Sequence, residues 1–234
     1  MDLDFIRKNY VDLKSNIKSV CRKFGRDENE IKIVAVSKTF SPEYVIELFS
    51  AGHKDFGENR VQELVSKKDV LKNKNINWHL IGHLQTNKVK YIIDFVRLIH
   101  SVDSYKLALE INNHANKSQK VIEVLVQVNT SGENQKSGIE LGEATKLCKS
   151  ISVLDNVKLR GLMTIGMLTE DEKIIRNNFS CLNKIYSELN PIYKNFDILS
   201  MGMTSDYAIA IEEGANMIRV GSALFGSRIY NQLN

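Results

Sequence analysis

Lys38 is the residue of this chain best suited to covalent chemistry. It follows the apolar run IVAV after one serine, so its side chain begins near the interior of the fold. Burial removes water from an ammonium group, and we therefore expect the pKa of Lys38 to lie below its usual value. A partly neutral amine can attack an aldehyde and form a Schiff base. The position alone equally allows a lysine that extends to solvent, or one that pairs with a carboxylate such as Glu58.

Two turns near the C-terminus combine glycines with hydroxyl side chains. They lie in the segments SMGMTSD (200–206) and RVGSALFG (219–226). Each opens a predicted helix, whose first N–H groups and positive dipole end attract an anion. We therefore expect a phosphate-binding cup here. The alternative is ordinary turn chemistry, in which glycine and serine are also common.

A lysine on one side and a phosphate cup on the other describe the site of a phosphorylated aldehyde cofactor. Arg219 begins the second of the two turns. A permanent cation there would face the pyridine nitrogen of such a cofactor and keep it unprotonated, which weakens the ring as an electron sink. Arg219 could equally bind the phosphate directly.

The elements that position these residues alternate along the chain. An amphipathic helix is predicted over 3–24, and short apolar runs then alternate with segments of helical period. The predicted strands cover 31–37, 54–57, 77–81, 97–102, 120–129, 158–164, 197–200 and 217–220, and the helices between and after them cover 41–51, 58–70, 87–95, 104–116, 139–151, 170–189 and 204–213.

Strands alternating with helices predict an α/β fold with a parallel sheet, and eight such units predict a (β/α)8 TIM barrel. An open doubly wound sheet is the alternative. No linker divides the chain, so we expect one domain over residues 1–234, preceded only by its extra N-terminal helix. The working groups of such barrels lie at the carboxyl ends of the strands, which is where Lys38 and both turns fall.

Composition limits the other classes of function. Basic and acidic residues number 32 and 28, and a net charge of +4 over 234 residues indicates a solvated surface more than a nucleic-acid-binding stripe. No stretch approaches 18 uncharged apolar residues and no signal-peptide pattern is present, so we expect no membrane partner. Three widely spaced cysteines favour a reducing compartment, and we expect a cytoplasmic protein. His79 and His83 are four residues apart, but the first lies in a predicted strand and no third ligand is evident, so we expect no metal site.

Six stretches, taken together, resemble the YggS/PROSC family of pyridoxal phosphate homeostasis proteins. They are IVAVSKTF, FGENRVQE, WHLIGHLQTNK, GLMTIG, LSMGMTSD and IRVGSALFG, which follow one another from about residue 31 to residue 226. The resemblance implies a barrel like the cofactor domain of alanine racemase (fold type III), with pyridoxal 5′-phosphate (PLP) held by Lys38. It also implies that Asn59 and Arg219 face the cofactor. The implied phosphate cup consists of Ser200, Gly202, Thr204, Gly221 and Ser222.

Two functions remain for such a site: a PLP carrier and a PLP-dependent amino-acid racemase. A racemase needs a second acid or base on the opposite face of the cofactor. In alanine racemase the partner subunit and an extra domain supply that group, and this chain ends soon after its eighth predicted strand. We therefore expect a non-catalytic monomer that stores, buffers or delivers PLP, with PLP-dependent apo-enzymes as acceptors.

Overall fold

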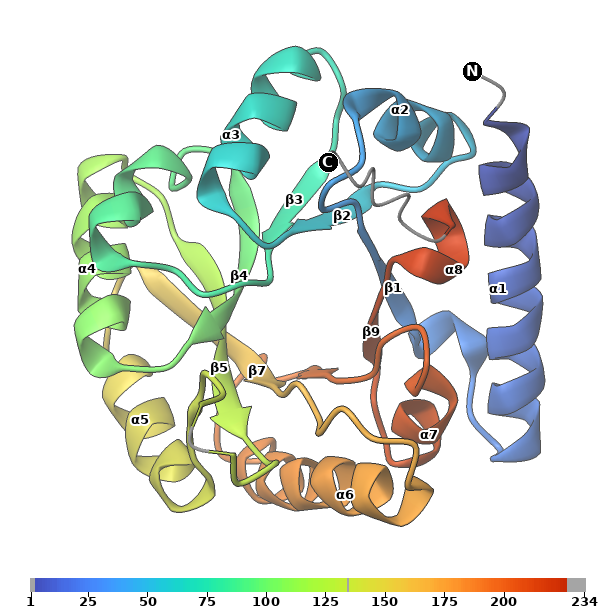
Figure 1. Cartoon of the computed structure of the whole chain (residues 1–234). Coiled ribbons are helices and arrows are strands. Elements are labelled where there is room, and N and C mark those ends of the chain that lie inside the picture. Colours follow the sequence, from blue (N-terminus) through green and yellow to red (C-terminus); the bar gives the residue numbers. More distant parts are fainter. Residues whose placement is uncertain (1–2, 134, 227–234) are drawn as a thin grey trace.

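The computed structural model describes residues 3–133 and 135–226. Eight parallel strands close into a barrel, because β1 pairs with both β2 and β9, and β4 pairs with β5. Figure 1 shows the ring of helices that surrounds them. The barrel strands are β1 (Lys32–Val36), β2 (Asp55–Glu58), β3 (Asn77–Leu80), β4 (Val96–Val102), β5 (Ile122–Asn129), β7 (Val157–Met163), β8 (Ile198–Ser200) and β9 (Met217–Val220). The predicted (β/α)8 barrel is confirmed, and its closure rules out the open doubly wound sheet.

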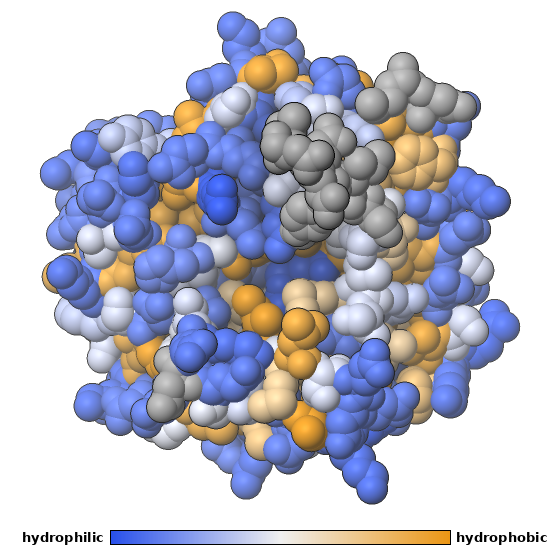
Figure 2. Space-filling model, viewed as in Figure 1, coloured by the Kyte–Doolittle hydropathy of each residue, from blue (hydrophilic) through white to orange (hydrophobic). Residues whose placement is uncertain are grey.

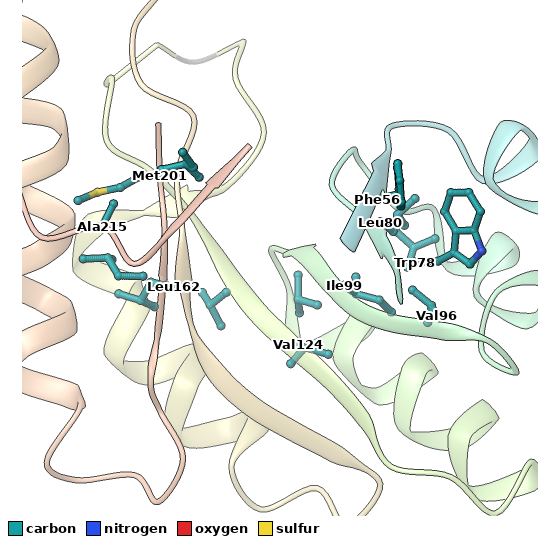
Figure 3. Packing of buried hydrophobic residues seen from close by; sticks show 14 of the residues in the cluster. Phe56, Trp78, Leu80, Val96, Ile99, Val124, Leu162, Met201 and Ala215 are labelled. Atoms are coloured by element: carbon teal, nitrogen blue, oxygen red, sulfur yellow. The ribbon is translucent and has the colours of Figure 1, made fainter. Parts of the chain in front are cut away.

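The strands bury apolar side chains on both faces, as a parallel barrel requires. On the inner face, Val34 and Val36 of β1 belong to a small cluster with Ile81, Leu98, Leu125, Met163, Ile198 and Met217. On the outer face a larger cluster fills the layer between strands and helices. Figure 3 shows part of this outer cluster, in which Phe56, Trp78 and Leu80 lie close together. Because side chains point alternately to the two faces of a strand, every second residue faces the barrel interior. The same alternation decides which side chains point inward at the barrel mouth.

The helices cover the outside of the barrel. They are α1 (Asp4–Lys23), α2 (Pro42–Ser50), α3 (Val61–Val70), α4 (Tyr105–Lys117), α5 (Ala144–Ile151), α6 (Glu172–Leu189), α7 (Tyr207–Glu212) and α8 (Ser222–Phe225). The extra N-terminal helix α1 runs beside α2, α7 and α8 (Figure 1) and buries Ile6, Leu13, Ile17 and Cys21 against the barrel. Of the helices in the described residues, none combines the length and apolar character needed to cross a membrane.

Some predicted helices have different boundaries. The segment predicted as a helix over 87–95 forms instead the shorter 3₁₀ helix η2 (Thr86–Tyr91), which buries Val89 and is followed by buried Ile92 and Ile93. The helix predicted from residue 58 begins at Val61, since Glu58 still pairs with Leu80 in the sheet.

The segment predicted as a helix over 139–151 begins instead with a two-residue strand. This strand, β6 (Ile139–Glu140), pairs with the end of β5 and is followed by the 3₁₀ turn η3 (Leu141–Glu143) and then by α5. β5 is long enough to extend past its barrel neighbours. The backbone N–H and C=O groups at its end are therefore free to pair with residues 139–140. The barrel itself is unaffected.

Candidate functional site

A pocket of about 540 Å³ opens at the mouth of the barrel. Figure 2 shows the face hollowed at its centre, with hydrophilic residues at the bottom of the hollow. The volume is within the usual range for small-molecule sites. Six of the eight predicted site residues line it: Lys38, Asn59, Thr204, Arg219, Gly221 and Ser222.

Lys38 reaches the pocket because of its position on β1. Val34 and Val36 face the barrel interior, and the period of two carries the same direction on to Lys38, two residues past Val36. The side chain is half-buried and lines the pocket. Its amine therefore lies where an aldehyde-bearing ligand would meet it.

A buried charge network holds the strand end that carries Lys38. Lys67 of α3 is 4 % exposed, and its ammonium donates to the Ser37 carbonyl and to Glu58 Oε1, each at 2.6 Å. Glu58 Oε1 also accepts from the Ser37 hydroxyl at 2.6 Å, and Glu58 Oε2 is buried with no partner among the described residues. Burial raises the pKa of Glu58 against the opposing charge of Lys67. The carboxylate that the sequence offered as a partner for Lys38 is therefore a partner of Lys67 and Ser37.

The same network reaches the residue after Lys38. Glu63 Oε1 accepts from the Thr39 amide at 2.6 Å and from the Lys67 ammonium at 2.8 Å. Thr39 has a φ of +71°, a left-handed conformation that is rare for a β-branched residue. We call Ser37, Thr39, Glu58, Glu63 and Lys67 the outer clamp. Both neighbours of Lys38 are thus fastened from outside the barrel wall.

Arg219 lies deeper in the barrel, on the neighbouring strand β9, where it pairs with Val34. Its side chain is 4 % exposed, and its Nη1 donates to Ser200 Oγ at 2.7 Å and its Nη2 to the Thr164 carbonyl at 2.8 Å. Burial lowers the pKa of Arg219 to about 10, with the charge of Asp206 opposing this effect. The guanidinium therefore remains a cation at neutral pH, and both of these hydrogen-bond partners are uncharged.

Ser200 and Gly202 do not line the pocket. Ser200 is fully buried, and its hydroxyl lies between Arg219 and His100. Gly202 has a φ of +93°, and a Cβ added there would lie 2.5 Å from the Cβ of Ala210. Ser200 therefore supports the site from beneath the pocket through its hydrogen bond with Arg219. Gly202 supports it by allowing its turn to pack on α7.

The turns after β8 and β9 reach the pocket through Thr204, Gly221 and Ser222. They are also joined, since the Ala223 amide donates to Thr204 Oγ1 at 3.4 Å. On the other side, Gly82 lets the loops after β2 and β3 approach, because a Cβ there would lie 2.2 Å from the Asn59 carbonyl oxygen. That approach brings Asn59 to the pocket wall.

Five further polar residues line the pocket without having been predicted as site residues: His83, Gln127, Lys136, Ser137 and Ser205. Lys136 donates to the Gly166 carbonyl at 3.1 Å and pairs with Glu133. His83 and Lys136 follow the end of a predicted strand and Gln127 lies near the end of one, which was the available signal. His79, the other member of the spaced histidine pair, lies in the barrel interior with Asp55 and His100, whereas the side chain of His83 is 57 % exposed. Within residues 3–133 and 135–226 no cluster of three or more metal-ligating side chains is found.

Fold and pocket together define a class of protein: a parallel eight-stranded barrel with a lysine at its mouth, an arginine deeper on the next strand, and hydroxyl-bearing turns beside them. The family model described as alanine racemase, N-terminal domain, matches residues 9–229. A pyridoxal phosphate homeostasis protein of Aquifex aeolicus is 44 % identical over 215 residues, which cover 92 % of this chain and 94 % of the relative. One of the same name from Vibrio alginolyticus is 38 % identical over 230 residues, covering 97 % and 99 %. The chain belongs to the pyridoxal phosphate homeostasis proteins, within the alanine racemase N-terminal domain family.

Solved structures show the same barrel. PipY of Synechococcus elongatus, solved with PLP bound, has a TM-score of 0.83 and 31 % identity, with 94 % of this chain and 100 % of PipY covered. An alanine racemase of Clostridium difficile has a TM-score of 0.76 at 19 % identity, and this chain covers 57 % of it. The racemase thus shares the fold over little more than half of its own length.

Proposed function

We propose that this chain binds PLP at the barrel mouth and serves PLP homeostasis by storing, buffering or delivering the cofactor in the cytoplasm. The observation that carries the proposal is the placement of Lys38 and Arg219 on one pocket with the turns of Thr204, Gly221 and Ser222. The membership of the family and the PLP bound to PipY support it. We further propose that the chain acts as a single-domain monomer.

The residues present fit the chemistry of PLP. PLP supplies an aldehyde, and Lys38 supplies the amine that can hold it covalently. Arg219 is a buried cation whose two hydrogen-bond partners are neutral, so it suits an electron-rich acceptor such as a ring nitrogen. Thr204, Gly221 and Ser222 then take the phosphate with hydroxyl and backbone N–H groups, and Asn59 contacts the cofactor from the wall of β2. Ser200 and Gly202, which the family resemblance placed in the cup, support this arrangement from below.

The carrier function is favoured over racemisation by the groups around the pocket. Proton transfer on the second face of the cofactor needs a held acid or base. Among the described lining residues no tyrosine occurs, His83 is largely exposed, and Lys136 is already bonded to Glu133 and to a backbone carbonyl. An accessible pocket of this kind also suits transfer of PLP to acceptor apo-enzymes.

Borohydride reduction of the PLP-loaded protein, followed by peptide mapping, tests the covalent attachment. We expect a pyridoxyl-phosphate adduct on Lys38, lost in Lys38→Ala and kept in the control Lys146→Ala, whose side chain is 80 % exposed. An adduct on another lysine in the unaltered protein would refute the assignment of Lys38.

Racemisation of alanine and other amino acids by the loaded protein separates the two functions. We expect no turnover above that of free PLP. Turnover that Lys38→Ala abolishes would make the chain an enzyme and refute the carrier.

A further inference from the structure

Beneath the pocket a row of polar side chains crosses the barrel interior. It starts at Arg219 on β9 and continues through neighbours on other strands to the amino end of β2. Arg219, Ser200, His100 and His79 are each no more than 4 % exposed, whereas the side chain of Asp55 is 42 % exposed. We call Arg219, Ser200, His100, His79 and Asp55 the interior chain.

Each step of the interior chain is a hydrogen bond. Below the bond from Arg219, Ser200 Oγ lies 3.2 Å from His100 Nδ1, and His100 Nε2 lies 2.9 Å from His79 Nδ1. His79 Nε2 then lies 3.2 Å from Asp55 Oδ1. Such a series satisfies the buried polar groups and makes the interior rigid, because each unmatched donor or acceptor would be costly.

If both histidines are neutral, the two ends of the interior chain fix the direction of every bond in it. A guanidinium can only donate and a carboxylate can only accept. Ser200 therefore accepts from Arg219, and His79 donates from Nε2 to Asp55. Neutral His79 then accepts on Nδ1 from His100 Nε2, and neutral His100 accepts on Nδ1 from the Ser200 hydroxyl. Both histidines are then protonated on Nε2.

The charges around the interior chain agree with this arrangement. Burial, with a smaller effect of the Arg219 charge, holds the pKa of His100 well below its ordinary value. Burial alone would raise the pKa of Asp55, but the hydrogen bond from His79, followed by that from Asn77, lowers it. Asp55 thus stays a carboxylate and can anchor the lower end.

We propose that the interior chain positions the Arg219 guanidinium toward the pocket, so that His100 and His79 are positioning residues for the cofactor site although neither lines it. The proposal rests on the proposed function, since PLP is the ligand toward which Arg219 is held. The alternative is that the same residues only fill the barrel. Substitution of residues that only fill the barrel would affect folding alone. Residues that position Arg219 have a defined proton arrangement, and their substitution changes the affinity for PLP.

Histidine ¹⁵N chemical shifts of the protein without PLP test the proton arrangement. At pH 7 we expect both His79 and His100 as neutral Nε2–H tautomers, with His114 on α4 as an assignable surface reference paired with Glu110. An Nδ1–H tautomer or a cation at either position would overturn the proposal. This measurement does not depend on PLP binding.

Titration with PLP, followed by absorbance, tests the positioning role. His100→Leu removes both bonds of that ring, and we expect PLP affinity to fall about tenfold. His100→Gln keeps one acceptor and one donor and should recover most of the affinity, while His114→Gln should bind as the unaltered protein does. His79→Leu, which removes both bonds of that ring and is expected to weaken PLP binding less than His100→Leu, serves if His100→Leu does not fold.

Two results of the titration would be decisive. A folded His100→Leu, or in its place a folded variant of His79, that binds PLP as tightly as the unaltered protein would overturn the positioning role. Failure of the unaltered protein to bind PLP would instead refute the proposed function. The histidine tautomers would still test the proton arrangement of the interior chain.

Discussion

Lys38 and Arg219 extend from neighbouring strands into one pocket, yet their supports lie on different sides of the barrel wall. Lys38 is supported from the outer layer, where Lys67 of α3 ties Ser37 to Glu58 and Glu63. Arg219 is supported from within the barrel, by Ser200 and the two histidines below it. The outer clamp acts on backbone, and the interior chain acts on a side chain.

The two supports also differ in charge. The outer clamp uses a full ion pair, and Glu63 within it is still 24 % exposed. In the proposed arrangement the interior chain has no charge between its two ends, because isolated charges in a closed interior carry a large desolvation cost. The comparison shows two ways to support a buried position: an ion pair whose two charges compensate each other, and a series of neutral hydrogen bonds between charged ends.

The largest effect should come from breaking the ion pair of the outer clamp. Lys67→Met leaves Glu58 buried without its cation, and we expect a loss of about 3 kcal/mol in the free energy of unfolding. Urea unfolding at pH 7 measures it. In Glu58→Gln/Lys67→Met no buried charge remains, so most of the loss should be recovered. A free energy of unfolding of Lys67→Met within about 1 kcal/mol of that of the unaltered protein would show that the clamp does not act as a buried ion pair.

A buried turn on the Arg219 side should tolerate substitution poorly. Gly202→Ala adds a Cβ 2.5 Å from that of Ala210 at a φ of +93°, and Gly202 also accepts the Arg219 amide. We expect a loss of about 2 kcal/mol, together with weaker PLP binding. Gly142→Ala is the matched control, because nothing lies within 4 Å of its added Cβ. Equal stability of the two variants would contradict the constraint.

Removing the hydroxyl between the two parts of the interior chain should have a smaller effect. Ser200→Ala deletes one bond to Arg219 and one to His100, and leaves the outer clamp intact. We expect about 1 kcal/mol of lost stability and PLP affinity lowered severalfold. Retention of PLP, measured by its release during dialysis, checks the second part. Unchanged retention would mean that Arg219 keeps its position without Ser200.

The last prediction concerns pH. The folded-state pKa of His100 lies below its ordinary value near 6.5, so below pH 6.5 the unfolded chain binds a proton that the folded protein excludes. Stability from this group is complete above pH 6.5 and declines as pH falls, by at most about 1.4 kcal/mol per pH unit. In His100→Gln that decline should be smaller, although buried His53, whose pKa is also lowered, keeps part of it. Parallel stability curves from pH 7 to pH 5 for the two proteins would contradict this account.

Much of the fold and part of the site could be predicted because their signals are local. Apolar runs mark most of the barrel strands, and the period of two aims Lys38 and Arg219 inward without any knowledge of their neighbours. The missed lining residues His83 and Lys136 follow strands in the same way. The misassigned helix over 87–95 shows the limit, since its three buried residues suit either kind of helix.

The sequence by itself determined the strand–helix order, the position of Lys38 at the end of a strand, and the glycines and hydroxyls of the last two turns. Only the tertiary structure decided that the sheet closes, that Ser200 faces Arg219 and not the pocket, and that Lys67 belongs to Glu58 and Ser37. It alone brought Asp55, His79 and His100 into one row. The physical reason is that alternation assigns each side chain to a face, whereas its partners depend on the register between strands far apart in the chain.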